Sequence, residues 1–338
     1  MSIWRRFLPP TGYPQGRGCP QVPRCRPTSQ AAVPHCCCMD EWIAGVREAD
    51  GLILRERALH GGVDPDQIMK ALRTGRLRRM QRGIYVHRED EASPLAIARA
   101  AVLASGVSDA VASHRTAARV HGIPIPPGTF AEQVTVQRAQ RRIQRRELVF
   151  HGRAMGIGDV MMIDRVPVTS PARTLVDLAG SFKQLPAVWA IDDALRRGLT
   201  DRRAIGRSLA QRPSAPGETR ARDRIRQADG RAESILETAG RLALADAGLR
   251  LPIPQYQVDD GAGFVAFLDG AYPDDMVGLE FDGHGPHSRP EAIFRDRQRQ
   301  NSLMRLGWTI LRFTWWDVMY GTSHYVAQVR DAITSAAA

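Results

Sequence analysis

The sequence has 338 residues, of which 43% are hydrophobic and 25% charged, the balance of a globular protein with roughly two or three domains. No run of about 18 apolar residues occurs, which excludes an ordinary membrane-spanning helix. The formal charge is +11, and 45 of the 47 basic residues are arginine. Such a chain favours a polyanionic partner such as nucleic acid, although a GC-rich genome also raises arginine at the expense of lysine.

The first 38 residues differ in composition from the rest of the chain. They contain all five cysteines and five arginines but no acidic residue. The three consecutive cysteines at 36–38 lack the spacing of zinc ligands, and the segment lacks the apolar run of a secretory signal. We expect residues 1–38 to be either a disordered arm or an upstream extension of a protein that starts at Met39. Because the remainder has no cysteine, we expect a cytoplasmic location.

The segment 39–90 has the signals of a winged helix-turn-helix. Apolar residues at helical spacing predict a helix over 42–57, and Asp64 followed by Pro65 predicts the start of the next helix. Residues 77–86 then alternate basic and apolar side chains around a glycine, which predicts a short β-hairpin. Helix, turn, helix and basic hairpin follow one another in the order of a winged helix.

Five arginines lie in or just before the predicted hairpin. Arginines on such an edge contact DNA phosphates, which gives salt-sensitive affinity without reading the base sequence. The alternative is a winged helix used for protein contacts, with its basic face in water. The expected DNA-contacting residues are Arg73, Arg76, Arg78, Arg79 and Arg82.

A mixed α/β region is predicted over 91–210, followed by a linker and charged helix over 211–231. Two Ser-Pro pairs, at 93–94 and 170–171, mark helix starts, and strands are predicted at 134–136 and 147–150.

Three stretches between residues 50 and 178 carry recognisable motifs: "GLILRERALHGGVDPDQIMKALRTGRLRRMQRGIYV", "AVASHRTAARVHGIP" and "VTSPARTLVDLA". They contain a basic wing with a glycine, a Ser-His-Arg helix start and a Thr-Ser-Pro-Ala-Arg-Thr junction. Together they resemble AbiEi-type antitoxins and their relatives. The resemblance implies an antitoxin-like winged helix, a DNA-binding role and a protein toxin as partner.

The segment 232–330 has an ordered pattern of acidic residues. Ser234 and Glu237 form a Ser-x-x-Glu capping box at the start of a predicted helix. Helix, strand, strand, helix, strand is the core order of the restriction-endonuclease-like fold. The predicted elements after the first helix are a strand over 264–269, a turn at 273–275, a strand over 277–283, a helix over 294–301 and a strand over 307–314.

Two of these strands place acidic residues opposite each other. If the hairpin turn is Asp274-Asp275, then Asp269 faces Glu280 and Asp282 lies on the same side as Glu280. Neighbouring carboxylates repel and raise one another's pKa, and a divalent cation removes that cost. Oxygen ligands suit Mg²⁺ or Mn²⁺, on which a water can attack a phosphodiester. The pattern predicts a metal site at Asp269, Glu280 and Asp282.

The same stretch combines a helix glutamate, an aspartate, a Glu-x-Asp strand, a histidine after Asp-Gly, a charged helix and "GWTILRFTW". Over 233–318 this combination resembles the Vsr-like branch of the PD-(D/E)XK nuclease superfamily. The resemblance implies a DNA endonuclease whose catalytic residues are Glu237, Asp269, Glu280, Asp282 and His287, with Arg297 and Arg299 contacting DNA. The superfamily's lysine is replaced by Asp282, as in the Vsr-like branch, which leaves His287 as the candidate general acid or base.

Each of these features also has a structural interpretation. Glu237 can be a helix cap, Asp282 part of a turn, and Asp296 an ion-pair partner of Arg299. The expected fold class is an α+β multidomain protein with a winged helix-turn-helix, a mixed α/β middle region and a C-terminal restriction-endonuclease-like α/β fold. The expected function is a Mg²⁺-dependent DNA endonuclease, and the alternative is an antitoxin-type transcriptional regulator whose nuclease-like domain is catalytically silent.

Overall fold

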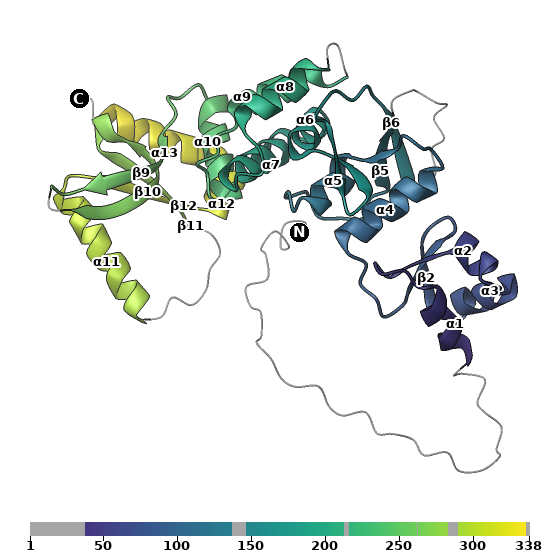
Figure 1. Ribbon diagram of the computed structural model, residues 1–338. Helices are drawn as coiled ribbons and strands as arrows, with labels where there is room; N and C mark the ends of the chain where they lie inside the picture. Colours follow the sequence, from purple (N-terminus) through teal and green to yellow (C-terminus); the bar gives the residue numbers. More distant parts are fainter. Residues whose placement is uncertain (1–37, 137–146, 213–215, 262, 283–289, 336–338) are drawn as a thin grey trace. The chain divides into compact units, whose positions relative to one another are not determined.

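A computed structural model of the protein describes residues 38–136, 147–212, 216–261, 263–282 and 290–335 (Figure 1). Its contacts divide the chain into two compact units. The first holds the described residues up to Val120 with Ile125–Met155 and Val160–Thr169. The second holds His121–Pro124, Gly156–Asp159 and the described residues from Ser170 onward. The predicted domain limits near 90, 210 and 231 fall inside these units and stay predictions. The predicted arm 1–38 lies outside the described residues except for Cys38.

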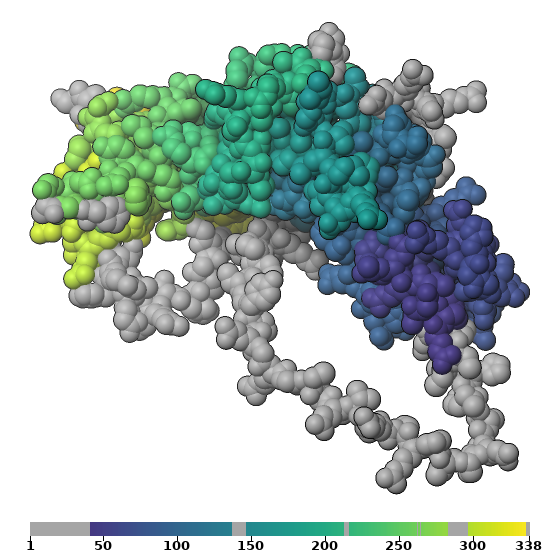
Figure 2. Space-filling model, viewed as in Figure 1, coloured from purple at the N-terminus to yellow at the C-terminus, as the bar shows by residue number. Residues whose placement is uncertain are grey.

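The first unit begins with three helices and a three-stranded sheet of order β1-β3-β2. The helices are α1 (Cys38–Val46), α2 (Arg55–His60) and α3 (Pro65–Arg73), and the strands are β1 (Leu52–Leu54), β2 (Leu77–Gln81) and β3 (Ile84–His87). Ile43, Ile53, Ile68 and Tyr85 share one buried cluster, which joins the helices to the sheet. The side chains of this part, coloured purple, form one contiguous body (Figure 2).

The predicted helix over 42–57 is wrong, because the chain leaves the helix after Val46. Gly51 follows with a φ of 84°, a left-handed conformation that glycine adopts without steric cost. The Asp50 carboxylate accepts a hydrogen bond from the Leu52 amide at 3.2 Å, which stabilises this turn. The next three residues form β1 and pair with β3, so a strand interrupts the helical pattern.

The helix predicted to begin at Asp64 and Pro65 and the hairpin predicted over 77–86 are both present in the structure. The Asp64 side chain accepts a hydrogen bond from the Asp66 amide at 2.8 Å, and Gln67 completes a capping box at the start of α3. β2 and β3 form the predicted antiparallel hairpin, and Gly83 takes a φ of 75° in its turn.

A five-stranded sheet of order β6-β5-β4-β8-β7 completes the first unit. The alanine-rich helix α4 (Pro94–Ser105) is buried on two sides, with Ala96 and Ala100 beside Val134 and with Ala98 beside Val168. The other elements are β4 (Val111–Ala112), α5 (His114–Val120), β5 (Glu132–Val136), β6 (Leu148–Gly152), β7 (Val160–Ile163) and β8 (Val166–Thr169).

The second unit joins a group of helices to a four-stranded sheet of order β12-β11-β10-β9, in which β11 and β12 are parallel. None of the helices in the described ranges has the length and apolar character needed to cross a bilayer. The elements of the second unit are α6 (Pro171–Ser181), α7 (Gln184–Arg196), α8 (Arg202–Ala210), α9 (Glu218–Gln227), α10 (Ile235–Asp246), β9 (Ile253–Asp259), β10 (Phe264–Tyr272), η1 (Pro273–Asp275), β11 (Val277–Asp282), α11 (Pro290–Arg305), β12 (Thr309–Thr314), α12 (Trp315–Met319) and α13 (Thr322–Ser335).

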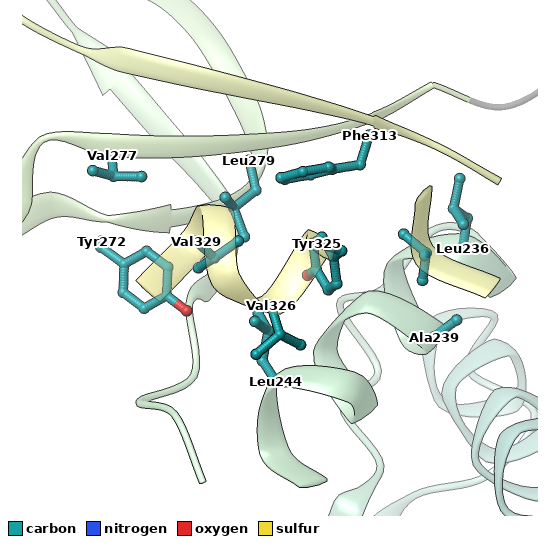
Figure 3. Packing of buried hydrophobic residues seen from close by; sticks show 11 residues of the cluster. Leu236, Ala239, Leu244, Tyr272, Val277, Leu279, Phe313, Tyr325, Val326 and Val329 are labelled. Atoms are coloured by element: carbon teal, nitrogen blue, oxygen red, sulfur yellow. The ribbon is translucent and has the colours of Figure 1, made fainter. Parts of the chain in front are cut away.

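Helices cover both faces of this sheet (Figure 1). On one face, Leu236 of α10 and Tyr325 of α13 pack against Leu279 and Phe313, as Figure 3 shows. On the other face, Leu303 of α11 packs against residues of β9 and β10. The chain is therefore α+β with several sheets, as expected. The elements predicted for this segment are present, and the structure adds the edge strand β9 and the C-terminal helices α12 and α13, which were not predicted.

Candidate functional site

The hairpin β2–β3 presents arginines to solvent and contains a β-bulge. The pairing of β2 with β3 shifts register between Arg79 and Gln81, so the side chains of β2 no longer alternate strictly. Leu77 and Gln81 point inward and are buried, whereas Arg78 and Arg79 are both exposed. Arg82 is exposed in the turn that follows. The edge strand β2 and the turn after it therefore carry three exposed arginines.

The helix before the hairpin adds further basic side chains. Lys70 and Arg73 are exposed on the last turn of α3, and Met69 beside them is 62% exposed. Arg76 is half-buried between α3 and β2, and its carbonyl accepts a hydrogen bond from the Arg88 amide at 2.8 Å. The expected DNA-contacting residues of this part are thus placed on α3 and along the hairpin, with Arg76 the least exposed of the five.

The register of the β10–β11 hairpin agrees with the prediction. Gly270 pairs with Leu279 and Tyr272 with Val277, which places Asp269 opposite Glu280. The recorded pairing ends at Gly270, and there the Asp269 carboxylate accepts a hydrogen bond from the Phe281 amide at 2.7 Å. The Asp269 carboxylate therefore accepts the hydrogen bond from a β11 amide that a backbone carbonyl of β10 would accept in a regular ladder.

The side-chain amide of Gln255 links Glu237 to Asp269. Gln255 of β9 donates to Glu237 Oε2 at 3.1 Å and, more weakly, to Asp269 Oδ1 at 3.5 Å. Burial raises the pKa of the Glu237 carboxyl, and the negative charge of Asp269 raises it further. Burial also raises the pKa of Asp269, against the hydrogen bond from the Phe281 amide. Two carboxyl groups with raised pKa values in one place mark a candidate functional site.

The capping role of Glu237 differs in detail from the prediction. Its amide donates to the Ser234 hydroxyl at 3.1 Å, as in a capping box. Its carboxylate accepts from the Glu233 amide at 2.9 Å rather than from that of Ser234. The Oε2 atom of Glu237 thus accepts hydrogen bonds both from the Glu233 amide at the start of the helix and from the Gln255 side chain.

Glu280 is engaged by two arginines. Its Oε1 lies 3.0 Å from Arg299 Nη1 of α11, and its Oε2 lies 2.9 Å from Arg312 Nη2 of β12. The parallel register pairs Glu280 with Arg312 directly across β11 and β12. Because Glu280 is 6% exposed, these guanidinium groups balance a buried charge.

The predicted metal ligands have separate partners. Asp282 is exposed at the end of β11, Asp269 is hydrogen-bonded as above, and a cation at Glu280 would have to displace Arg299 and Arg312. In the described part of the chain, no three His, Cys, Asp or Glu side chains lie close enough to hold one ion. The described contacts therefore do not fit a divalent cation bound by all three carboxylates, and the Mg²⁺ or Mn²⁺ site stays a prediction.

His287 lies outside the described residues. Arg297 is exposed on α11, close in sequence to the paired Arg299.

Sequence reasoning missed Gln255 and Arg312. Gln255 has a φ of 49°, a strained conformation for a residue with a side chain, at the point of β9 that faces Asp269. Pro254 and Val258 are the buried residues of β9, but their spacing of four gives no alternating signal for a strand, and nothing local marks Gln255 itself. Glu280 pairs with Arg312 because β11 and β12 are parallel neighbours. The helix α11 separates the two strands in the sequence, so their register could not be predicted from local signals.

Comparisons with known proteins give relatives that match part of the chain. A crystal structure of the Rv2827c protein from Mycobacterium tuberculosis aligns with 64% of this chain and 88% of its own, at 18% identity and a TM-score of 0.38. Two proteins of Mycobacterium tuberculosis, Rv2248 of strain H37Rv and MT2308 of strain CDC 1551, are each 34% identical over 161 residues. These matches span 48% of this chain and 59% of each relative.

A family comparison gives the most specific result. The match begins in α4 and ends in α9, so it covers the five-stranded sheet and the helices α6 to α8. This result confirms the predicted resemblance for part of the range 50–178 and extends it beyond Leu178. Residues 99–226 match the model of the AbiEi antitoxin C-terminal domain.

Proposed function

We propose that the protein is a DNA-binding regulator of the antitoxin type. In this proposal residues 38–87 form a winged helix in which α3 and the β2–β3 hairpin contact DNA. The similarity of residues 99–226 to the AbiEi antitoxin C-terminal domain supports it. By the same similarity, we propose a protein toxin as the partner.

The exposed arginines of the β2–β3 hairpin are the observation that carries this proposal. Arg78 and Arg79 extend from the edge strand β2 and Arg82 from the turn that follows, so the hairpin holds their positions while their guanidinium groups reach solvent. Such groups fork onto phosphate oxygens and fix a protein on the duplex. The exposed side chains of Lys70 and Arg73 lie at the end of α3 nearest the hairpin in sequence.

The test is DNA affinity of the full chain for duplexes from upstream of its own gene, measured by fluorescence anisotropy. The variant Arg79→Gln/Arg82→Gln should bind about tenfold or more weakly, because each lost phosphate contact removes favourable counterion release. Arg203→Gln, which changes an exposed arginine of α8, is the matched control and should bind like the parent. Equal affinity of the double variant and the parent would contradict the proposal.

Metal-dependent cleavage of DNA is the second candidate function. The raised pKa values of Glu237 and Asp269 favour it, because paired acids of this kind recur at catalytic sites. In that case Asp269, Glu280 and Asp282 would hold Mg²⁺ or Mn²⁺ after Arg299 and Arg312 move away. The resemblance of residues 233–318 to Vsr-like nucleases agrees with this candidate.

Nicking of supercoiled plasmid with Mg²⁺ or Mn²⁺ tests this second candidate. The parent should nick, Asp269→Asn/Glu280→Gln should not, and Asp274→Asn should behave like the parent. Asp274 is a suitable control because its carboxylate is exposed in η1, outside the acidic cluster. No nicking by the parent, or equal nicking by the double variant, would leave the regulator as the proposed function.

A further inference from the structure

A groove in the second unit lies among the end of α9, the helix α10 and the first residues of β9. Its volume is about 490 Å³, which is within the range of pockets that bind small molecules. Part of its lining is apolar and includes Ala245 of α10 with Leu251 and Ile253. Leu251 and Ile253 are each 44% exposed, so water contacts apolar surface here. A ligand with an apolar part would displace that water favourably.

The lining also includes three arginines. Arg226, Arg231 and Arg241 face one lining carboxylate, that of Asp229. Arg231 pairs with Asp229 at 2.8 Å, and Arg226 pairs with Asp223 just outside the groove. The Arg226 pair is an exposed one of the kind that contributes little free energy, so this guanidinium group can exchange its partner for an anion. Arg231 holds Asp229 through both Nε and Nη2, at 3.0 and 2.8 Å, and is more than half exposed, so an anion can contact it on its outer side.

Arg241 is the buried arginine of the lining. It is 7% exposed, its Nη2 donates to Asp192 at 2.8 Å, and its Nη1 donates to the Gln227 carbonyl. Its buried Nε–H has no acceptor among the residues that the structure describes. Because Asp192 balances its charge, Arg241 forms part of the wall of the groove, and contact with an anion falls to the exposed arginines.

The chain itself offers no acidic segment to occupy the groove. Residues 1–37 and 137–146 each contain five arginines and no acid, and the other segments outside the described residues also contain no Asp or Glu. These segments would be repelled by the arginines that line the groove. The occupant that fits the charge must therefore come from outside the chain.

We propose that this groove binds a small amphipathic anion, an organic carboxylate or phosphate monoester with a short apolar chain. The anionic head contacts Arg226 and Arg231, and the apolar chain lies against Ala245, Leu251 and Ile253. Such a ligand would bridge the end of the AbiEi-like region, at 226, and the first strand of the C-terminal sheet. The groove shares no residue with the β2–β3 hairpin, so a test of ligand binding here does not depend on whether the hairpin binds DNA.

Isothermal titration of the full chain with octanoate and with octyl phosphate tests the proposal. At least one of the two anions should bind saturably with one site per chain, and the neutral analogue octanamide should bind at least tenfold more weakly, because it lacks the charge-assisted contacts. The head group that binds more tightly distinguishes a carboxylate ligand from a phosphate monoester.

Matched variants locate the site. Ala245→Trp should abolish binding by filling the groove, whereas Ala247→Trp, on the exposed C-cap of the same helix, should bind like the parent. Arg226→Gln should weaken binding about tenfold. Arg222→Gln, which changes an exposed arginine of α9 paired with Glu218 and outside the lining, should not. Equal binding of octanamide, unchanged binding by Ala245→Trp, or no saturable binding of either anion would overturn the proposal.

Discussion

Asp192 is the buried acid that joins two helices of the second unit. This residue of α7 accepts hydrogen bonds from Thr238 Oγ1 and Arg241 Nη2 of α10, each at 2.8 Å, and from the Asp229 amide at 2.6 Å. Burial raises the pKa of its carboxyl to about 6, although Arg241 and the hydrogen bonds act in the opposite direction. The carboxyl therefore changes charge within a range of pH in which most surface acids are already ionised.

Replacing Asp192 with Asn should change how stability depends on pH. In the unfolded chain the carboxyl ionises near pH 3.8, whereas in the folded chain it keeps its proton up to about pH 6. The contribution of this proton to the free energy of unfolding is fully present below pH 3.8 and is lost as pH rises through 6, by about 3 kcal/mol in total. Urea unfolding of the parent and Asp192→Asn between these pH values should show the parent losing stability relative to the variant. A constant difference would contradict the assignment.

At the scale of elements, a buried ion network connects α6 to α8 and to the segment before β7. Arg173 of α6 is fully buried, with its Nη1 2.7 Å from Asp159 and its Nε 3.1 Å from Asp177. Asp177 also pairs with Arg212 at 2.8 Å, and Ser208 of α8 donates to Asp159 at 2.8 Å. Buried charges of this kind are tolerated only while every partner is present. The network therefore specifies how these helices pack.

The variant Arg173→Met keeps the volume of the side chain but removes its charge. We expect it to lower the free energy of unfolding by about 3–5 kcal/mol, because Asp159 and Asp177 lose a buried cationic partner. Arg222→Ala, which removes an exposed i,i+4 pair with Glu218, should cost less than about 1 kcal/mol. Thermal unfolding followed by circular dichroism measures both. Equal melting temperatures for the two variants would mean that the network contributes no more than a surface pair.

The elements that could be predicted from sequence are those with local signals. Ser93 and Ser170 cap helices that begin at the following prolines, and the turn at 273–275 was enough to place Asp269 opposite Glu280. β1 could not be predicted, because its three residues are fixed by pairing with β3, about thirty residues later in the chain. The same holds for the pairs that neutralise Glu280, since they come from α11 and from a parallel neighbour. Local chemistry thus identified the acids but not their partners.

At the scale of the whole molecule, charge is concentrated rather than spread evenly. Of the formal charge of +11, five positive charges lie in residues 1–38, which hold five arginines and no acid. In the second unit, buried acids such as Asp177, Asp192 and Glu280 are matched by arginines, so the charges of those arginines are balanced within the protein. The exposed arginines of the β2–β3 hairpin have no such buried acid beside them in the described contacts.

This distribution makes a quantitative prediction about salt. The logarithm of DNA affinity should fall linearly with the logarithm of salt concentration, with a slope of about −0.9 for each phosphate contacted. Arg79→Gln/Arg82→Gln should therefore make the slope less negative by about 2, both in the full chain and in a chain that starts at Met39. Arg299→Gln should leave the slope unchanged, because that guanidinium is held by Glu280. Anisotropy titrations across a salt series measure all of these slopes. If the Met39 chain lost most of the slope while the double variant kept it, DNA would be contacted by residues 1–38 instead of by the hairpin.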